Sequence, residues 1–173
     1  RGRTAVGWGE TPLSVQWVWP SALSYAERHD SLVAFTEALA DAWAVFPEWG
    51  HPMEVGHAFQ EGVLGDLLAR HNARRRAASE PMPWLAALVC CSAYDIALHD
   101  AYGVLHGVPA YATYTGEYMG RDLSAYLEGA SGADVSFAGH YPADYLCEEP
   151  PRRLSAWHLV GGLDLLTRAD LTG

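Results

Sequence analysis

Apolar residues recur at helical spacing in the first third of the chain and predict a helix there. They follow an i, i+3, i+7 and i+11 pattern, which places all four on one helix face. The stripe consists of Leu32, Phe35, Leu39 and Trp43. Asp30 or Ser31 can cap this helix at its amino end, and the Phe46-Pro47 pair follows its last turn.

Two longer apolar patterns predict a second and a third helix. The second runs from Pro52, a residue tolerated in a first turn, to Arg75. Its four-residue stripe consists of Val55, Phe59, Val63 and Leu67. The arginine run at residues 74–76 suits the carboxyl end of a helix dipole, and a solvated helix end is favoured over a phosphate clamp. The third helix, from about Pro83 to Tyr102, is apolar nearly all round, so we expect neighbours on several sides.

Two carboxylates interrupt the third predicted helix. Asp95 and Asp100 are five positions apart, which turns them about 140° from each other around the helix axis. They therefore share no face, and we expect each to be paired or hydrogen-bonded in a structural role rather than to form a metal site. Gly103 and Gly107, followed by Pro109, then end the helix.

The chain before these helices alternates with the two-residue period of a β-strand. The alternating positions are Thr4, Val6 and Trp8. Residues 4–8 therefore predict one half of a β-hairpin. The loop after Glu10 contains two prolines and two tryptophans, Trp17 and Trp19. Aromatic side chains in such a loop either cover a pocket or pack against the domain itself, and the pattern favours neither.

The periodicity fades after Tyr114. Residues 119–128 predict one short helix, and residues 129–151, which are rich in Gly, Pro, Ser, Asp and Tyr, are typical of a surface connection. A last apolar segment, residues 155–164, predicts a short strand around Trp157–Val160.

Composition and charge exclude several classes of function. Half of the residues are hydrophobic, and 21 acidic residues against 11 basic ones leave a net charge of −10. This balance excludes a wholly disordered chain and argues against non-specific binding to nucleic acid or to an anionic membrane. The sequence contains no lysine, so all 11 bases are arginines. A Schiff base, a P-loop lysine and a lysine proton abstractor are therefore excluded within this chain.

Cysteine and histidine spacing gives little support for a metal site. The adjacent Cys90 and Cys91 lie in the apolar third helix, where we expect small core residues, and no Cys-x-x-Cys occurs. The eight histidines form no His-Glu-x-x-His pattern, and their closest spacings favour separate surface or core roles. The pairs in question are His51 with His57 and His99 with His106. A His-based metal or haem protein remains the weakest alternative.

Other sequence signals concern compartment and catalysis. No apolar run is long enough for a bilayer span, and no cationic start precedes an apolar run, so we predict a cytoplasmic protein. Because the first residue is Arg, we expect a processed chain or a piece of a longer one. Gly7-Trp8-Gly9 lacks the third glycine of a dinucleotide loop, and Gly-x-Ser-x-Gly is absent. The residues alone predict an α+β fragment without an identifiable active site.

Two motifs resemble a known family. The segment G-W-G-E-T-P-L-S at residues 7–14 is similar to the strand and following loop of the capping domain in the enolase superfamily. The run A-Y-D-I-A-L-H-D-A-Y-G-V-L-H-G-V-P-A-Y at residues 93–111 is similar to the long helix that closes that domain. With three helices in the expected order, the chain resembles the mandelate racemase/muconate lactonizing branch.

The resemblance implies an α+β fold with a partial antiparallel sheet and a helical bundle. It places a partial capping domain at residues 1–114, an extended connection at 115–152 and the start of a (β/α)7β barrel at 153–173. Such enzymes are isomerases or lyases that use Mg²⁺ and abstract the α-proton of a small carboxylate substrate. Their metal ligands and base lie on barrel strands, which would follow Gly173, so we assign no catalytic or metal-binding residue here.

The same resemblance points to the loop after Glu10 as the substrate-facing part of the cap. In the family the matching loop overhangs the barrel mouth, so we expect Trp17 and Trp19 to contact substrate. We also expect the parent enzyme to form a homo-oligomer. We expect the isolated chain to be inactive, because it lacks lysine and the carboxylate-bearing barrel strands. We expect it to be poorly soluble or oligomeric when expressed alone, because residues 4–8 and Trp157–Val160 would be unpaired strands. The alternative is a stand-alone cap-like binding or structural module that acts through this tryptophan-rich loop.

Overall fold

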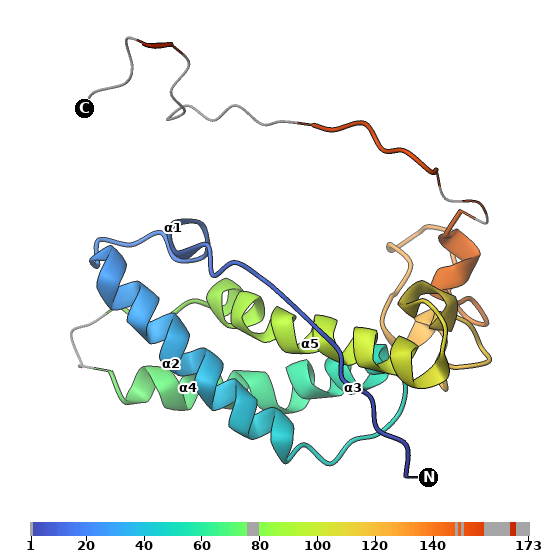
Figure 1. Cartoon of the computed structure of the whole chain (residues 1–173), viewed down its shortest axis with the longest axis horizontal. Coiled ribbons are helices and arrows are strands. Elements are labelled where there is room, and N and C mark those ends of the chain that lie inside the picture. Colours follow the sequence, from blue (N-terminus) through green and yellow to red (C-terminus); the bar gives the residue numbers. More distant parts are fainter. Residues whose placement is uncertain (1, 76–79, 148, 150, 158–166, 169–173) are drawn as a thin grey trace.

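The computed structural model of the protein describes residues 2–75, 80–147, 149, 151–157, 167 and 168. It is built from helices joined by loops (Figure 1). The α-helices are α1 Val15–Val18, α2 Tyr25–Ala44, α3 Pro52–Phe59, α4 Gly65–Ala73 and α5 Trp84–His106. A π-helical turn, η1 (Gln60–Leu64), joins α3 to α4 without a break. Three 3-10 turns follow, η2 Ala110–Thr113, η3 Leu123–Ala125 and η4 Pro142–Tyr145.

The predicted α+β fold with a partial antiparallel sheet is wrong, because the described residues contain no β-strand. Residues 4–8 are extended, and this part of the chain passes beside α5 (Figure 1). Alternation in the sequence favours an extended backbone, but a strand also needs a partner that supplies a ladder of hydrogen bonds. No other described segment pairs with residues 4–8. The second predicted strand, Trp157–Val160, falls largely outside the described residues, since positions 158–160 are not described.

The first helix begins earlier than its sequence pattern predicts. Ser24, rather than Asp30 or Ser31, is the N-cap of α2, and its hydroxyl accepts the Glu27 N–H at 3.2 Å. A serine cap of this kind contributes about 1 kcal/mol to helix stability. The buried Arg28 is thereby placed inside α2, where its guanidinium donates to the carbonyl oxygen of Trp19 at 2.5 Å. This bond ties α2 to the loop before it.

The second and third predicted helices are present with small differences. Residues 52–73 form the continuous α3–η1–α4 helix, which begins with Pro52 in its first turn. α5 extends one turn beyond the predicted end at Tyr102, to His106. Gly107 then caps α5 with φ 72°, a left-handed conformation that favours glycine. The predicted helix at residues 119–128 is reduced to the single turn η3.

The core lies where α2 and the α3–η1–α4 helix pack against α5 (Figure 1). Phe59 is its centre: the ring is fully buried and stacks on Trp43 with centroids 3.9 Å apart and planes 7° apart. Phe46 meets the same ring edge-on at 5.1 Å. The other large buried core side chains include Trp19, Leu32, Phe35, Leu39, Leu64 and Met82. Within the described ranges, every helix is too short or too polar to span a membrane.

Candidate functional site

The amino-terminal segment contacts α5 through two glycines. A Cβ atom at Gly7 would collide with backbone atoms of Ala97 and Ala101, and one at Gly9 with backbone atoms of Ala93 and Ala97. Only glycine therefore permits this close approach of the two backbones. Between the glycines, the Trp8 N–H donates to Oδ2 of Asp100 at 2.8 Å. The two motifs of the family resemblance are thus in direct contact.

A hollow of about 380 Å³ opens beside this contact. Five of its lining residues form what we call the junction cluster: Trp8, Asp95, His99, Asp100 and Tyr114. Asp95 reaches toward α3, where a Cβ atom at Gly56 would collide with its Oδ1. Asp100 therefore binds the amino-terminal segment, whereas the polar partner of Asp95 is His99, one turn further along α5, with Oδ2 and Nε2 3.8 Å apart. These contacts agree with the expectation that each carboxylate is hydrogen-bonded or paired.

Tyr114, His99 and Asp95 lie in a row within the junction cluster, with their polar atoms facing one another. The Tyr114 hydroxyl and Nδ1 of His99 lie 3.0 Å apart and share a hydrogen bond. The other ring nitrogen of His99, Nε2, lies 3.8 Å from Oδ2 of Asp95. Burial raises the pKa of Asp95 and lowers the pKa of His99, while each group partly offsets the shift of the other. Both shifts favour the uncharged forms.

A second polar arrangement, the His51–Glu54 clamp, holds the chain after α5. Glu54 accepts the Gly120 and Arg121 N–H groups on Oε1, at 2.6 and 2.8 Å, and the His51 N–H on Oε2 at 3.3 Å. The His51 ring accepts the Met53 N–H on Nδ1, so its Nε2–H donates to the Thr113 hydroxyl at 3.0 Å. Burial, helped by His99, lowers the pKa of His51 to about 4. This ring is therefore neutral at pH 7.

Neither arrangement forms a metal centre. Among the described residues, no group of three or more His, Cys, Asp or Glu side chains could hold a metal ion. The histidine pairs take part in ring and hydrogen-bond contacts instead: His57 packs edge-on against Tyr126, and His106 against Tyr118. Chemically, the junction cluster presents carboxylate, imidazole and phenol groups to its hollow, all of them able to form hydrogen bonds.

The two tryptophans of the tryptophan-rich loop differ sharply in burial. Trp19 is 1% exposed within the core, and the Arg75 guanidinium lies 4.8 Å from its ring centroid. Trp17, on α1, is 68% exposed and borders an open hollow of about 320 Å³ together with Tyr25. α1 starts after Ser14, whose φ of 45° is rare for a residue with a side chain. Such backbone strain is concentrated at ligand-binding loops.

Sequence reasoning missed the clamp and the partners of Asp95. The His-Pro-x-Glu pattern at residues 51–54 resembles a capping box, with a histidine in place of Ser or Thr, and could have predicted the helix start. No sequence signal predicts that Glu54 also binds residues 120 and 121, because these lie 66 and 67 positions away. The sequence likewise gives no sign that Gly56 lies against Asp95, because this contact depends on how α3 packs on α5.

No protein-family model, curated protein or solved structure matches this chain. The resemblance to the enolase superfamily therefore rests on the motifs at residues 7–14 and 93–111.

Proposed function

We propose that this chain is the capping portion of a Mg²⁺-dependent enzyme of the enolase superfamily, from the mandelate racemase/muconate lactonizing branch. The observation that carries the proposal is the contact between its two motifs. Trp8 and Asp100 are 92 positions apart and share a 2.8 Å hydrogen bond, and Gly7 and Gly9 lie against α5 at the same place. Direct packing of the two motifs supports the proposal that both belong to one capping domain.

The reaction we propose for the whole enzyme is abstraction of the α-proton of a small carboxylate, as in a racemase, dehydratase or cycloisomerase. The carboxylates of the junction cluster do not suit Mg²⁺: Asp100 accepts the Trp8 N–H, and Asp95 is directed to α3 with its pKa raised. Mg²⁺ prefers several hard oxygen ligands in an octahedral arrangement. We therefore place the metal ligands and the catalytic base outside this chain, and expect the isolated 173 residues to be inactive.

The role proposed for the cap is to exclude water and select the substrate side chain. The exposed Trp17 and the strained turn at Ser14 support the loop after Glu10 as the selecting element. A large exposed ring can cover an apolar or sugar-like substrate face. We also propose a cytoplasmic enzyme, in line with the three free cysteines in the described residues, because disulfides persist mainly in oxidising compartments.

The reading frame beyond the Gly173 codon provides the first test. We expect it to continue into a barrel with a Lys-x-Lys strand and spaced Asp or Glu strand ends. The full-length protein should then exchange the α-proton of a carboxylate substrate in D2O, measured by NMR, and should lose that exchange when Mg²⁺ is chelated. An in-frame stop codon, or a full-length protein without Mg²⁺-dependent exchange on a broad panel of acid sugars and amino acid derivatives, would contradict the enzyme proposal and favour the stand-alone module.

Tryptophan variants of the full-length enzyme test the loop. Trp17→Ala should change kcat/KM unequally between substrates while leaving the melting temperature unchanged. Trp49→Ala is the matched control, since Trp49 is 90% exposed and lies outside the loop. Trp19→Ala should lower stability by about 3–5 kcal/mol, the usual cost of truncating a buried aromatic residue. If Trp17→Ala keeps the wild-type order of substrates, the ring has no selecting role.

A further inference from the structure

The hollow beside the junction cluster combines carboxylates with open aromatic rings. Trp8 reaches it from the amino-terminal segment, while Tyr111 and Tyr114 come from η2 and the residue after it. Trp8 is 81% exposed and Tyr111 72% exposed, so most of both side chains is open to solvent. The volume of about 380 Å³ falls within the usual range of small-molecule sites. This hollow lies outside the tryptophan-rich loop, and the proposed function assigns it no ligand.

The carboxylates of this hollow lack a cationic partner among the described residues. No arginine lines it, and no ion pair in the described ranges joins Asp95 or Asp100 to an arginine. The His99 ring lies 3.8 Å from Asp95, but burial lowers the pKa of His99, so this ring is neutral at pH 7. The chain contains no lysine. The hollow therefore holds negative charge that no base lining it offsets.

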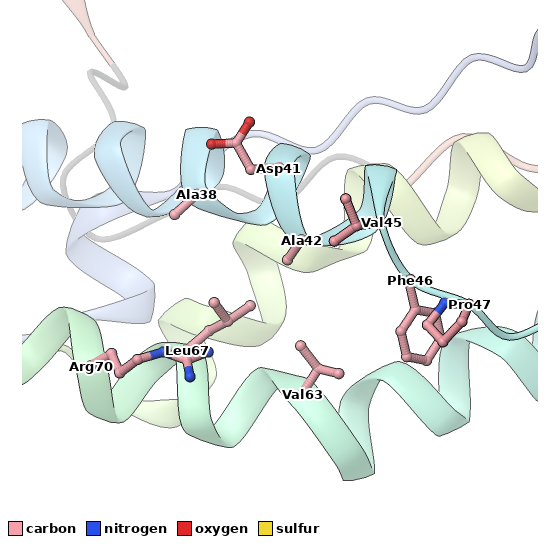
Figure 2. Close-up of a pocket in the computed structure, with 9 residues that line it drawn as sticks. All are labelled: Ala38, Asp41, Ala42, Val45, Phe46, Pro47, Val63, Leu67 and Arg70. Atoms are coloured by element: carbon pink, nitrogen blue, oxygen red, sulfur yellow. The ribbon is translucent and has the colours of Figure 1, made fainter.

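The apolar groove between α2 and α4 shows a different kind of lining (Figure 2). It is larger, about 470 Å³, and seven of its nine lining residues are apolar. The other two are one acid and one base, Asp41 on α2 and Arg70 on α4. Phe46 is its one aromatic side chain. This groove therefore has no preference for a cation, whereas the hollow of the junction cluster combines two carboxylates with three aromatic rings.

We propose that the hollow of the junction cluster binds a small aliphatic amine in its protonated form. The ammonium group donates charge-assisted hydrogen bonds to a carboxylate, and the aromatic rings attract the cation over their faces. Asp95 and Asp100 are five positions apart on α5, which separates them by about 7.5 Å along the helix axis. A diamine can therefore offer one ammonium group to each carboxylate, and we expect diamines to bind more tightly than monoamines.

The surroundings of Asp95 support an organic cation. Burial raises the pKa of Asp95, and the neighbouring His99 only partly offsets this shift. An ammonium ion beside the carboxylate stabilises its charged form and so lowers this pKa. The same ligand would touch Trp8 and α5 together, and would therefore strengthen the contact between the amino-terminal segment and the helix. The site needs no residue beyond this chain, so it stands independently of the enzyme proposal.

Titration of the full chain with cadaverine tests the site. The indole N–H signal of Trp8 in NMR spectra, assigned through its loss in Trp8→Phe, should shift and saturate in the millimolar range or below. Pentylamine, with a single charge, should bind more weakly, and pentanol, with none, should give no saturable shift. Magnesium chloride at matched ionic strength is the control for screening of the acidic chain. A cadaverine titration without saturation, or equal effects of magnesium chloride or pentanol, would overturn the proposal.

Carboxylate variants test the charge contacts. Asp95→Asn and Asp100→Asn should each weaken cadaverine binding at least about tenfold, because each removes a charged acceptor. Asparagine at position 100 keeps an oxygen acceptor for the Trp8 N–H, so the approach of the amino-terminal segment is retained. Asp134→Asn, an exposed change in a distant loop, removes the same charge and should bind cadaverine as the wild type does. An equal loss in this control would mean that net charge alone attracts the amine.

A ring variant tests the aromatic contacts without disturbing the fold. Tyr111→Ala should weaken cadaverine binding about fivefold, the scale of an exposed cation–π contact, and should leave the melting temperature unchanged because the side chain is exposed. Tyr145→Ala, also exposed but outside the hollow, is the matched control and should bind normally. This pair decides the question even if Asp95→Asn fails to fold. Unchanged affinity in Tyr111→Ala, or the same loss in Tyr145→Ala, would overturn the proposed site.

Discussion

The helical array of α2–α5 and the loop region, residues 108–147, are held together by different forces. The array buries a continuous apolar cluster centred on Phe59. The loop region buries few side chains and is fixed by single polar groups, chiefly the clamp at Glu54 and the Asp122 carboxylate, which accepts the Gly139 N–H at 2.7 Å. The stability gained by burial in the array is spread over many residues, whereas each polar contact that holds the loop region depends on a single carboxylate. We therefore expect the loop region to open locally before the array unfolds.

The largest loss of stability should come from a substitution in the core of the helical array. Phe59→Ala removes the ring between Trp43 and Phe46, and truncation of a buried Phe costs about 3–5 kcal/mol. Urea unfolding followed by circular dichroism should show this loss as a lower midpoint. Val33→Ala, a partly exposed position on α2, should change stability far less. Equal losses for both variants would mean that the array has no dominant packing centre.

The next effect depends on pH and concerns the clamp histidine. The pKa of His51 is about 4 in the folded protein and about 6.5 when unfolded, so the unfolded state binds the proton first as the pH falls. Stability is therefore lost between pH 6.5 and pH 4, by up to about 3 kcal/mol. His51→Asn keeps a helix-capping acceptor but does not titrate. Urea unfolding at several pH values should show a shallower pH dependence for this variant, and parallel curves would contradict the prediction.

A smaller effect should follow from removing the clamp carboxylate. Glu54→Ala leaves the Gly120 and Arg121 N–H groups without their charged acceptor, a loss of about 2 kcal/mol for hydrogen bonds of this kind. Limited proteolysis should cut the loop region faster while the array stays protected. Glu37→Ala, an exposed change on α2, is the control. If both variants are cut at the wild-type rate, the clamp does not hold the loop region.

The smallest effect should come from Asp122→Asn. Hydrogen bonds from Ser124 and Gly139 lower the pKa of this exposed carboxylate, so its charged form is the one that binds them. The variant should exchange the Gly139 amide hydrogen faster, as measured by NMR. The global melting temperature should not change, because the array determines it. A lower melting temperature would show that the two regions unfold as one unit.

Sequence patterns predicted the helices well because each helix has its own apolar period. The stripe from Leu32 to Trp43 lies in α2, and the stripe from Val55 to Leu67 lies in the α3–η1–α4 helix. Boundaries were less accurate: the cap at Ser24 lies six residues before the predicted Asp30. Local signals compete at helix ends, and the start at Ser24 places Arg28 where its guanidinium donates to the carbonyl oxygen of Trp19.

The candidate site was only partly predictable. The sequence predicted that Asp95 and Asp100 are paired or hydrogen-bonded, and in the structure Asp100 accepts the Trp8 N–H while Asp95 lies 3.8 Å from the His99 ring. The different burial of Trp17 and Trp19 did not follow, because one loop can direct two nearby rings to opposite sides. The sequence could not predict the hydrogen-bond partners of Glu54 either, since they come from residues far along the chain.

The sequence alone determined the three long helical stretches, the net charge and the absence of lysine, since each depends on residue identity or local spacing. Tertiary structure alone decided that residues 4–8 are an extended segment against α5 and not part of a sheet. An alternating pattern specifies backbone conformation, but the partner that turns it into a strand is a long-range contact. The groove between α2 and α4 has the same origin, because opposite charges on two helices become one surface only when the helices pack side by side.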